Sequence, residues 1–217
     1  MKTAQLSDNN TKSPQAENHH KAKRWFYSAV ALLAVLLIGM AAVVIFVDPY
    51  FHYHKPLPFL SYRIYEERYT NDGISRHFTY DAVITGTSMS QNFKTSELDE
   101  LFGTQSVKEP FSGAGLKELS GNLDRTLQYG QKVKMVVMPL DYNALLQDAD
   151  WQKYEEYPTY LYDNNIFNDT RYVWNKAIFY HGVVADLLRT LSGEPTTTMD
   201  EYSSWVRETG LEHIMAS

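Results

Sequence analysis

Apolar residues form one long, uninterrupted run near the start of the chain. Residues 25–47 read WFYSAVALLAVLLIGMAAVVIFV, which is 23 residues without a charged side chain. A helix of that length measures about 34 Å and crosses the hydrocarbon core of a bilayer. Lys21, Lys23 and Arg24 stand just before it. Because positively charged flanks stay in the cytoplasm, the pattern predicts a cytoplasmic N-terminus and an extracellular position for residues 48–217.

A cleaved signal peptide is the alternative interpretation of this run. Such peptides have a shorter apolar core, of about 7–15 residues, followed by a small-x-small cleavage site. Here the apolar run continues past Ala41 and Ala42 into residues 43–47, and no such site follows. We therefore expect an uncleaved, single-pass transmembrane helix over residues 25–47. The polar residues 1–24 are expected to form a disordered cytoplasmic tail.

After the apolar run, aromatic and charged residues alternate without a long hydrophobic segment. We interpret residues 48–79 as a juxtamembrane connector. Tyr62, Tyr65 and Tyr69 recur at helical spacing within it, and the sequence Asn-Asp-Gly at residues 71–73 is a turn signal. The connector is expected to pack on the domain and to lead into its first strand.

Residues 80–142 then alternate between strand-like and helix-like patterns. Short apolar runs predict strands, and leucines at helical spacing, ended by glycines, predict helices. Strand, helix, strand, helix and strand follow each other with short connections, which implies a parallel sheet with right-handed crossovers. The predicted elements are strands at 80–86, from 106 and at 132–142, and helices at 96–103 and 116–130.

The rest of the chain is expected to complete one α/β domain over residues 80–217. From about residue 148 the sequence becomes rich in aromatic residues, and residues 169–193 predict one or two helices. We interpret this region as a helical insertion that covers the carboxyl edge of the sheet.

Charge and composition narrow the classes of partner. Residues 1–24 hold five Lys and Arg against two acidic residues, a net charge of +3, whereas residues 48–217 hold fifteen against twenty-four, a net charge of −9. An acidic main domain does not suit nucleic acid, which requires a basic surface. With no cysteine in the chain, disulfides, thiolate metal sites and a cysteine nucleophile are excluded. We expect no metal and no cofactor. A membrane-tethered flavodoxin-like sensor would need a phosphate- or cofactor-binding loop, and GTSMS after the first strand is too short and too poor in glycine for one.

Three loops follow the predicted strands and carry small or polar residues. Because ligands of open parallel sheets bind outside the carboxyl ends of the strands, these loops hold the candidate site. Ser88 follows the first strand as a candidate nucleophile, Gly113 follows the second as a backbone oxyanion donor, and Asn143 follows the third as an amide donor. The alternative interpretation is structural: Ser88 or Ser90 caps a helix, Gly113 forms a turn and Asn143 caps the next segment.

Taken together, ITGTSMSQNF, PFSGAG and PLDYN resemble the first three conserved blocks of the SGNH/GDSL hydrolases. The chain is most similar in layout to membrane-anchored proteins of Gram-positive bacteria that act in teichoic-acid D-alanylation and polysaccharide O-acetylation. The resemblance implies a flavodoxin-like three-layer fold. It also implies that Ser88 is the catalytic serine, that Gly113 (with Gly115 as the alternative) and Asn143 bind the oxyanion, and that acyl groups on cell-envelope glycopolymers are the substrates. Membrane lipid and a membrane acyltransferase are the further partners that it implies.

Two departures from the family pattern change this expectation. Thr87 stands where the family usually has Asp, and no Asp lies three residues before any His, so the Asp-x-x-His block that supplies the base is missing. A serine needs a base to become an effective nucleophile. We therefore expect a chain truncated before that block, with an incomplete sheet. The alternative function is a non-catalytic envelope protein of the same fold that binds a polymer or a membrane partner.

Overall fold

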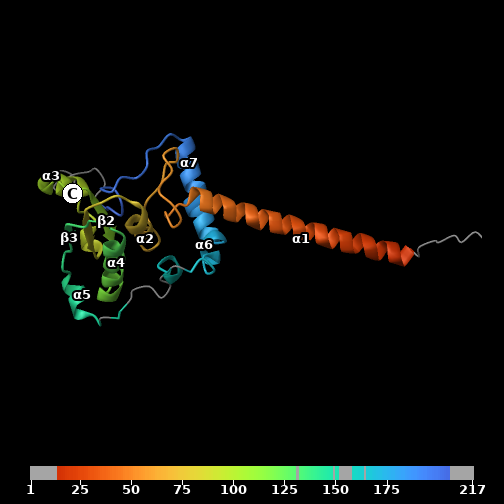
Figure 1. The fold of residues 1–217 in the computed structure, drawn as a ribbon, viewed down its shortest axis with the longest axis horizontal. Coiled ribbons are helices and arrows are strands. Elements are labelled where there is room, and N and C mark those ends of the chain that lie inside the picture. The colour runs from red at the N-terminus through yellow and green to blue at the C-terminus, as the bar shows by residue number, and fades with distance from the viewer. Residues whose placement is uncertain (1–13, 131, 149, 152–157, 164, 206–217) are drawn as a thin grey trace, which may run out of the picture. The chain divides into compact units, whose positions relative to one another are not determined.

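A computed structural model describes residues 14–130, 132–148, 150–151, 158–163 and 165–205 of the chain. The chain divides into two compact units, residues 1–41 and residues 42–217. Helix α1 (Pro14–Val47) begins earlier than the expected start at Trp25, so the end of the predicted disordered tail is helical (Figure 1). Its stretch His20–Val47 is long and apolar enough to span a membrane.

The second unit is built on a three-stranded parallel sheet in the order β2-β1-β3. The strands are β1 (Ala82–Gly86), β2 (Ser106–Pro110) and β3 (Met135–Val137). Strand β1 lies in the centre and is buried over its whole length. The predicted parallel sheet is thus confirmed. Strand β3 is shorter than the predicted strand 132–142, because Pro139 has no N–H group to donate to a ladder.

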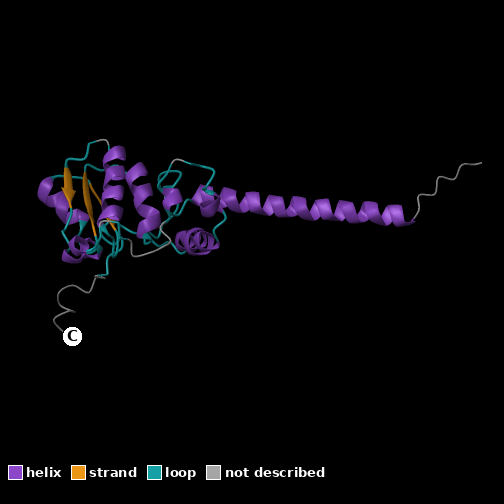
Figure 2. Ribbon diagram, turned by 90° about the horizontal axis from the view of Figure 1, so that it is seen from below, coloured by secondary structure: helices purple, strands orange, loops and turns teal. Residues whose placement is uncertain are grey.

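Helices lie on both faces of this sheet. Helix α3 (Thr95–Phe102) connects β1 to β2, and α4 (Leu116–Tyr129) connects β2 to β3. Since β1 is central, right-handed crossovers in opposite directions place these two helices on opposite faces. Figure 2 shows the strands between α3 on one side and α4 on the other. Both helices match their predicted ranges within one residue, and Gly103 ends α3 with a φ of +64°.

Helix α2 (Glu67–His77) corrects the interpretation of the connector. The sequence Asn71-Asp72-Gly73 lies in the middle of this helix and does not form a turn. Gly73 is required there because a Cβ atom would collide with the carbonyl oxygen of Tyr50. The helix packs on α4 and β2, so the predicted connector belongs to the domain.

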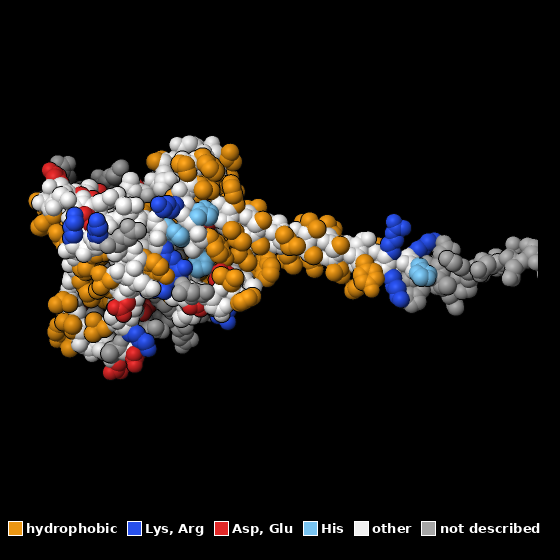
Figure 3. Space-filling model, in the orientation of Figure 1, with side chains coloured by type: hydrophobic (Ala, Val, Ile, Leu, Met, Phe, Trp, Pro, Cys, Tyr) orange, Lys and Arg blue, Asp and Glu red, His pale blue; other side chains and the backbone are white. Residues whose placement is uncertain are grey.

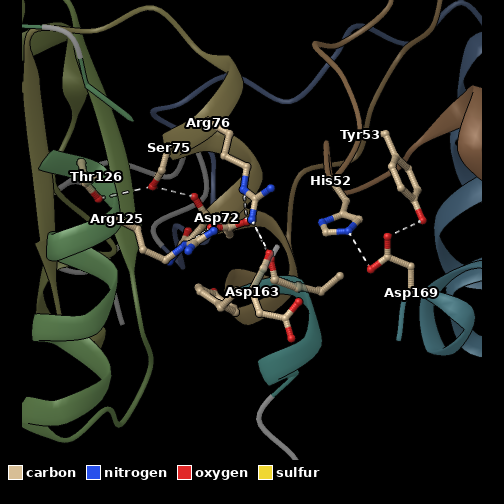
Figure 4. A network of polar contacts seen from close by, with 12 residues as sticks. His52, Tyr53, Asp72, Ser75, Arg76, Arg125, Thr126, Asp163 and Asp169 are labelled. Carbon is tan, nitrogen blue, oxygen red and sulfur yellow. Dashed lines mark hydrogen bonds and ion pairs between the residues drawn. The ribbon is translucent and has the colours of Figure 1, made fainter. Parts of the chain in front are cut away.

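The buried face of α2 is polar and joins a cluster with β2 and α4 (Figure 4). The Asp72 carboxylate pairs with Arg76, at 2.6 Å, and with Arg125. Deeper in the cluster, the fully buried Glu109 accepts a hydrogen bond from Ser75 at 2.8 Å. Asn122 and Thr126 of α4 donate to the other oxygen of Glu109, at 2.7 and 2.5 Å. These contacts hold three elements together, and they satisfy carboxylates that would be costly to bury alone.

The apolar core lies beside this polar cluster and draws on distant parts of the chain. Residues between α1 and α2, α2 itself, the first two strands and the last described segment all contribute to it. Its buried members are Phe51, Tyr62, Ile64, Ile74, Tyr80, Val83, Val107 and Tyr202.

A tight turn follows α1. Asp48, which has a φ of +47° and is fully buried, accepts hydrogen bonds from the backbone N–H groups of His52, Tyr53 and His54 at 2.7–3.0 Å. The hydroxyl of Tyr172 donates to the same carboxylate at 2.8 Å. Burial raises the pKa of Asp48, although these bonds oppose the shift. The turn therefore binds residues 48–54 to the C-terminal part of the domain.

The described part of the chain after β3 contains five short helical elements. They are α5 (Tyr142–Leu146), η2 (Thr159–Leu161), α6 (Thr170–Val173), the π-helical η3 (Ile178–Val184) and α7 (Ala185–Leu191). Within residues 169–193, α6 is followed by one continuous helical stretch from η3 through α7, which agrees with the one or two helices that the sequence predicted. The predicted aromatic-rich stretch from about residue 148 lies partly outside the described residues.

The last described segment returns to the start of the domain. Thr197 donates its N–H to Tyr62 at 2.9 Å, and the buried Tyr202 hydroxyl donates to Asn71 at 2.6 Å. Asp200 accepts hydrogen bonds from Thr95 and from both the N–H and hydroxyl of Ser96 at the start of α3. The segment therefore joins the residues before α2 to α3.

Candidate functional site

Ser88 lies directly beyond the carboxyl end of the central strand. Gly86 ends β1 with a φ of +141°, and Ser88 begins η1 (Ser88–Ser90), a single turn of 3-10 helix. The cap of this turn is Thr87, whose hydroxyl accepts the N–H of Met89 at 3.4 Å. Ser90 is buried and donates to the carbonyl of Thr87 at 2.8 Å. Ser88 therefore does not cap the helix, and it is half-buried at the sheet edge.

Gly113 lies in the loop beyond β2, the neighbouring strand. Its φ of +64° is the left-handed conformation that glycine adopts without steric cost. In the register of the sheet, Gly86 faces Pro110. Ser88 follows Gly86 by two positions, and Gly113 follows Pro110 by three. Neighbouring strands lie about 4.8 Å apart. The structure brings these two predicted site residues to the same edge.

Asn143 is the second residue of α5, which follows β3 on the other side of the central strand. The side chain of Asn143 lies outside the described residues. Asp141, two residues before Asn143, accepts a hydrogen bond from the Thr87 hydroxyl at 2.9 Å. This bond joins the loop that carries Ser88 to the loop that carries Asn143. The Thr87 side chain therefore connects the two loops.

Glu67, at the start of α2, forms the link to the loop beyond β2. One oxygen of its buried carboxylate accepts the N–H of Ser112 at 2.5 Å, and the other accepts the side-chain amide of Gln91. Ser112 precedes Gly113, and Gln91 follows η1 directly. One side chain thus fixes two of the three candidate loops. Sequence reasoning missed Glu67 because it is separated from its two partners by 24 and 45 residues.

A cavity of about 350 Å³ opens beside this link. Arg68 forms part of its wall, pairs with Glu118 at 2.9 Å and donates to the carbonyl of Ser112 at 3.2 Å. Glu66 lies in the same wall. Its pKa is raised, mainly by burial and further by the negative charge of the neighbouring Glu67. The cavity therefore combines aromatic rings and carboxylates next to the Gly113 loop. The lining residues are Tyr65, Glu66, Glu67, Arg68, Tyr69, Ser112 and Pro158.

Lys108 supports the candidate edge from within the sheet. Its fully buried ammonium group donates to the carbonyls of Gln91, at 2.6 Å, and Asp200, at 3.0 Å. Burial lowers the pKa of Lys108 to about 8, opposed by the charges of Asp200 and Glu67. Because both contacts go to backbone oxygens, the Lys108 side chain links the segment after η1 to the last described segment.

The described histidines that make tertiary contacts gather near the turn after α1. His52 pairs with Asp169 at 3.3 Å, and His54 contacts the carbonyl of Ile45 at 3.0 Å. Figure 4 shows His52 beside Asp169 and Tyr53. His181 lies in η3, where its carbonyl accepts the Tyr65 hydroxyl. Among the described residues, no hydrogen bond pairs a histidine with Ser88. His213 lies outside the described residues.

In the part of the chain that the structure describes, no group of three or more His, Cys, Asp or Glu side chains is arranged to hold a metal ion. Comparison with known proteins gives no match to a family model, a curated protein or a solved structure. The geometry of the three loops and the sequence resemblance therefore carry the functional argument together.

Proposed function

We propose that the protein is a membrane-anchored serine esterase or acyltransferase of SGNH type that acts on acyl groups of cell-envelope glycopolymers. The observation that carries the proposal is the position of Ser88. It stands beyond the carboxyl end of the central strand, and Thr87 takes the capping role that would otherwise explain a hydroxyl there. The order β2-β1-β3 supports the proposal, because it equals the first three strands of a flavodoxin-like sheet.

The reaction follows from the roles that the resemblance assigns. The Ser88 hydroxyl attacks the ester carbonyl and forms a new C–O bond, while a base takes its proton. The backbone N–H groups of Ser88 and Gly113, with the amide of Asn143, stabilise the oxyanion of the tetrahedral intermediate. Cleavage of the ester C–O bond releases the alcohol and leaves an acyl-serine. Water or a second hydroxyl then accepts the acyl group.

The location of the domain is part of the proposal. The basic residues Lys21, Lys23 and Arg24 precede the apolar part of α1, and such flanks favour the cytoplasmic side. Residues 48–217 then lie outside the cell membrane, where envelope polymers are accessible.

The test is hydrolysis of p-nitrophenyl acetate by the full chain in detergent micelles. Ser88→Ala is expected to remove the hydrolysis that depends on the protein. Ser120→Ala is the matched control, because Ser120 is exposed on α4 and bonds only a carbonyl of its own helix. Hydrolysis by Ser88→Ala at the wild-type rate would contradict the proposal.

One observation favours the alternative function of a non-catalytic envelope protein. No described histidine pairs with Ser88, so the base that the reaction needs is not seen among the described residues. If the protein only binds, the wild type and Ser88→Ala should bind O-acetylated cell-wall polysaccharide equally well. This alternative predicts that both proteins are retained by the immobilised polysaccharide and that neither has esterase activity.

A further inference from the structure

The helical stretch from η3 to α7 exposes a row of apolar side chains. Tyr180, Leu187, Leu188 and Leu191 are 56%, 37%, 59% and 83% exposed. They recur at helical spacing and so share one face. The opposite face, with Gly182, Val183 and Asp186, is buried. Figure 3 shows hydrophobic side chains gathered over α7.

This stretch is fastened to the residues that follow the end of α1. A Cβ atom on Gly182 would lie 2.7 Å from the ring of Pro49, so the helix backbone touches the turn after Val47. The Asp186 carboxylate accepts the N–H of Arg63, and the Thr190 hydroxyl accepts that of Ser61, both at 2.8 Å. These contacts hold both ends of the stretch beside the juxtamembrane segment.

One more exposed apolar side chain, that of Phe59, lies between α1 and α7. Phe59 is 61% exposed, and its ring centre lies 6.3 Å from that of Phe46 in the last turn of α1. Phe59 is two residues from Ser61, which bonds Thr190, and Thr190 is adjacent to Leu191. Phe59 thus continues the exposed row from α7 toward Phe46. We call Phe59, Tyr180, Leu187, Leu188 and Leu191 the apolar face.

Distances along the chain place the helix that carries this face close to the end of the apolar part of α1. Pro49 follows Val47 by two residues, which is at most about 7 Å of extended chain. The headgroup layer on each side of a bilayer is about 5–7 Å thick, and a helix with its side chains is about 10–12 Å across. A helix that touches Pro49 therefore lies within reach of this layer where the apolar part of α1 spans the bilayer.

We propose that the apolar face is a second membrane contact, which rests at the boundary between headgroups and acyl chains of the bilayer that α1 spans. Interfacial helices bury their apolar side about 5–10 Å deep in this way. The continuity of the face with Phe46 of α1 identifies lipid as its occupant. The exposed side chains Lys55, Arg63 and Lys176 flank the same segments and reach the phosphates of anionic headgroups.

The test uses the absence of cysteine from the chain. Leu191→Cys and Leu188→Cys in the full protein are labelled with the fluorophore NBD and reconstituted into vesicles of phosphatidylcholine and phosphatidylglycerol. The matched controls are Leu101→Cys in α3 and Leu146→Cys in α5, because these leucines are 76% and 68% exposed. All four leucines are exposed, so the fold is expected to tolerate each substitution.

Vesicles that contain doxyl-labelled lipid then report contact with acyl chains. The proposal predicts at least about twofold stronger quenching at positions 188 and 191 than at the controls, with blue-shifted emission. Equal quenching at all four positions would overturn it. Blue-shifted emission at 188 and 191 without lipid quenching would also overturn it, because protein, such as a second copy of the chain, would then cover the face.

Discussion

Replacing Glu109 by glutamine removes one titrating proton from the buried cluster and keeps its hydrogen bonds. With Glu109 protonated on the oxygen near Ser75, that oxygen donates to Ser75, and Ser75 donates to the carbonyl of Asn71 at 3.1 Å. The other oxygen accepts from Asn122 and Thr126. Glutamine reproduces this pattern, with its amide nitrogen toward Ser75. The neutral form of the cluster therefore survives in Glu109→Gln.

The size of the effect follows from the pKa of Glu109. Burial, opposed by the hydrogen bonds, raises this pKa from its usual 4.5 to about 7. Because this pKa is higher in the folded state, the contribution of Glu109 to stability is fully present below about pH 4.5 and is lost as the pH rises through about 7. Between about pH 5.5 and about pH 8, ionisation of Glu109 should lower the free energy of unfolding by about 2 kcal/mol.

The assay is urea unfolding of wild type and Glu109→Gln in detergent, followed by circular dichroism at both pH values. The difference in unfolding free energy between the two proteins should shift by about 2 kcal/mol in favour of the variant at the higher pH. Burial also raises the pKa of Asp186 to about 7, but this carboxylate is present in both proteins and cancels in the difference. A difference that does not change with pH would refute the reasoning.

Three further substitutions test the packing of α2, of α4 and of the turn after α1. Gly73→Ala should cost about 1–3 kcal/mol of unfolding free energy, because its Cβ collides with the carbonyl of Tyr50. Gly121→Ala, where nothing lies within 4 Å, should instead stabilise α4 by about 0.5–1 kcal/mol, and equal effects in urea unfolding would contradict this account. Asp48→Asn should cost about 1–3 kcal/mol, because its amide group must face backbone N–H donors, and an unchanged melting temperature would refute that role.

The sequence predicted the sheet because its strands and crossover helices follow ordinary apolar periodicity. It missed α2 for a physical reason. The inward face of this helix carries Thr70, Asn71, Asp72 and Ser75, all buried, so an apolar stripe does not mark it. The Asn-Asp-Gly signal then favoured a turn. Partners that are distant in sequence, among them Arg125 and Glu109, stabilise this polar face inside the protein.

Some features of the candidate site could likewise be predicted from the sequence, and others could not. The positions of Ser88 and Gly113 could be predicted, because each follows the end of a strand and parallel strands share an edge. The contacts of Thr87 with Asp141, and of Glu67 with Ser112, could not be predicted, because they join residues 54 and 45 positions apart. The roles of Ser88, Gly113 and Asn143 in catalysis remain predictions.

The central claim is that Ser88 is a nucleophile, and its reactivity toward a fluorophosphonate tests this most directly. The full chain in detergent is treated with the reagent, and labelled serines are located by peptide mass spectrometry. Ser88 should be labelled, whereas Ser120 in the same molecule, which is exposed on α4 and donates its hydroxyl to the carbonyl of Lys117, should not. Labelling of Ser88 that stops on heat denaturation would support an activated serine. Absence of labelling at Ser88, or labelling no greater than at Ser120, would contradict the account.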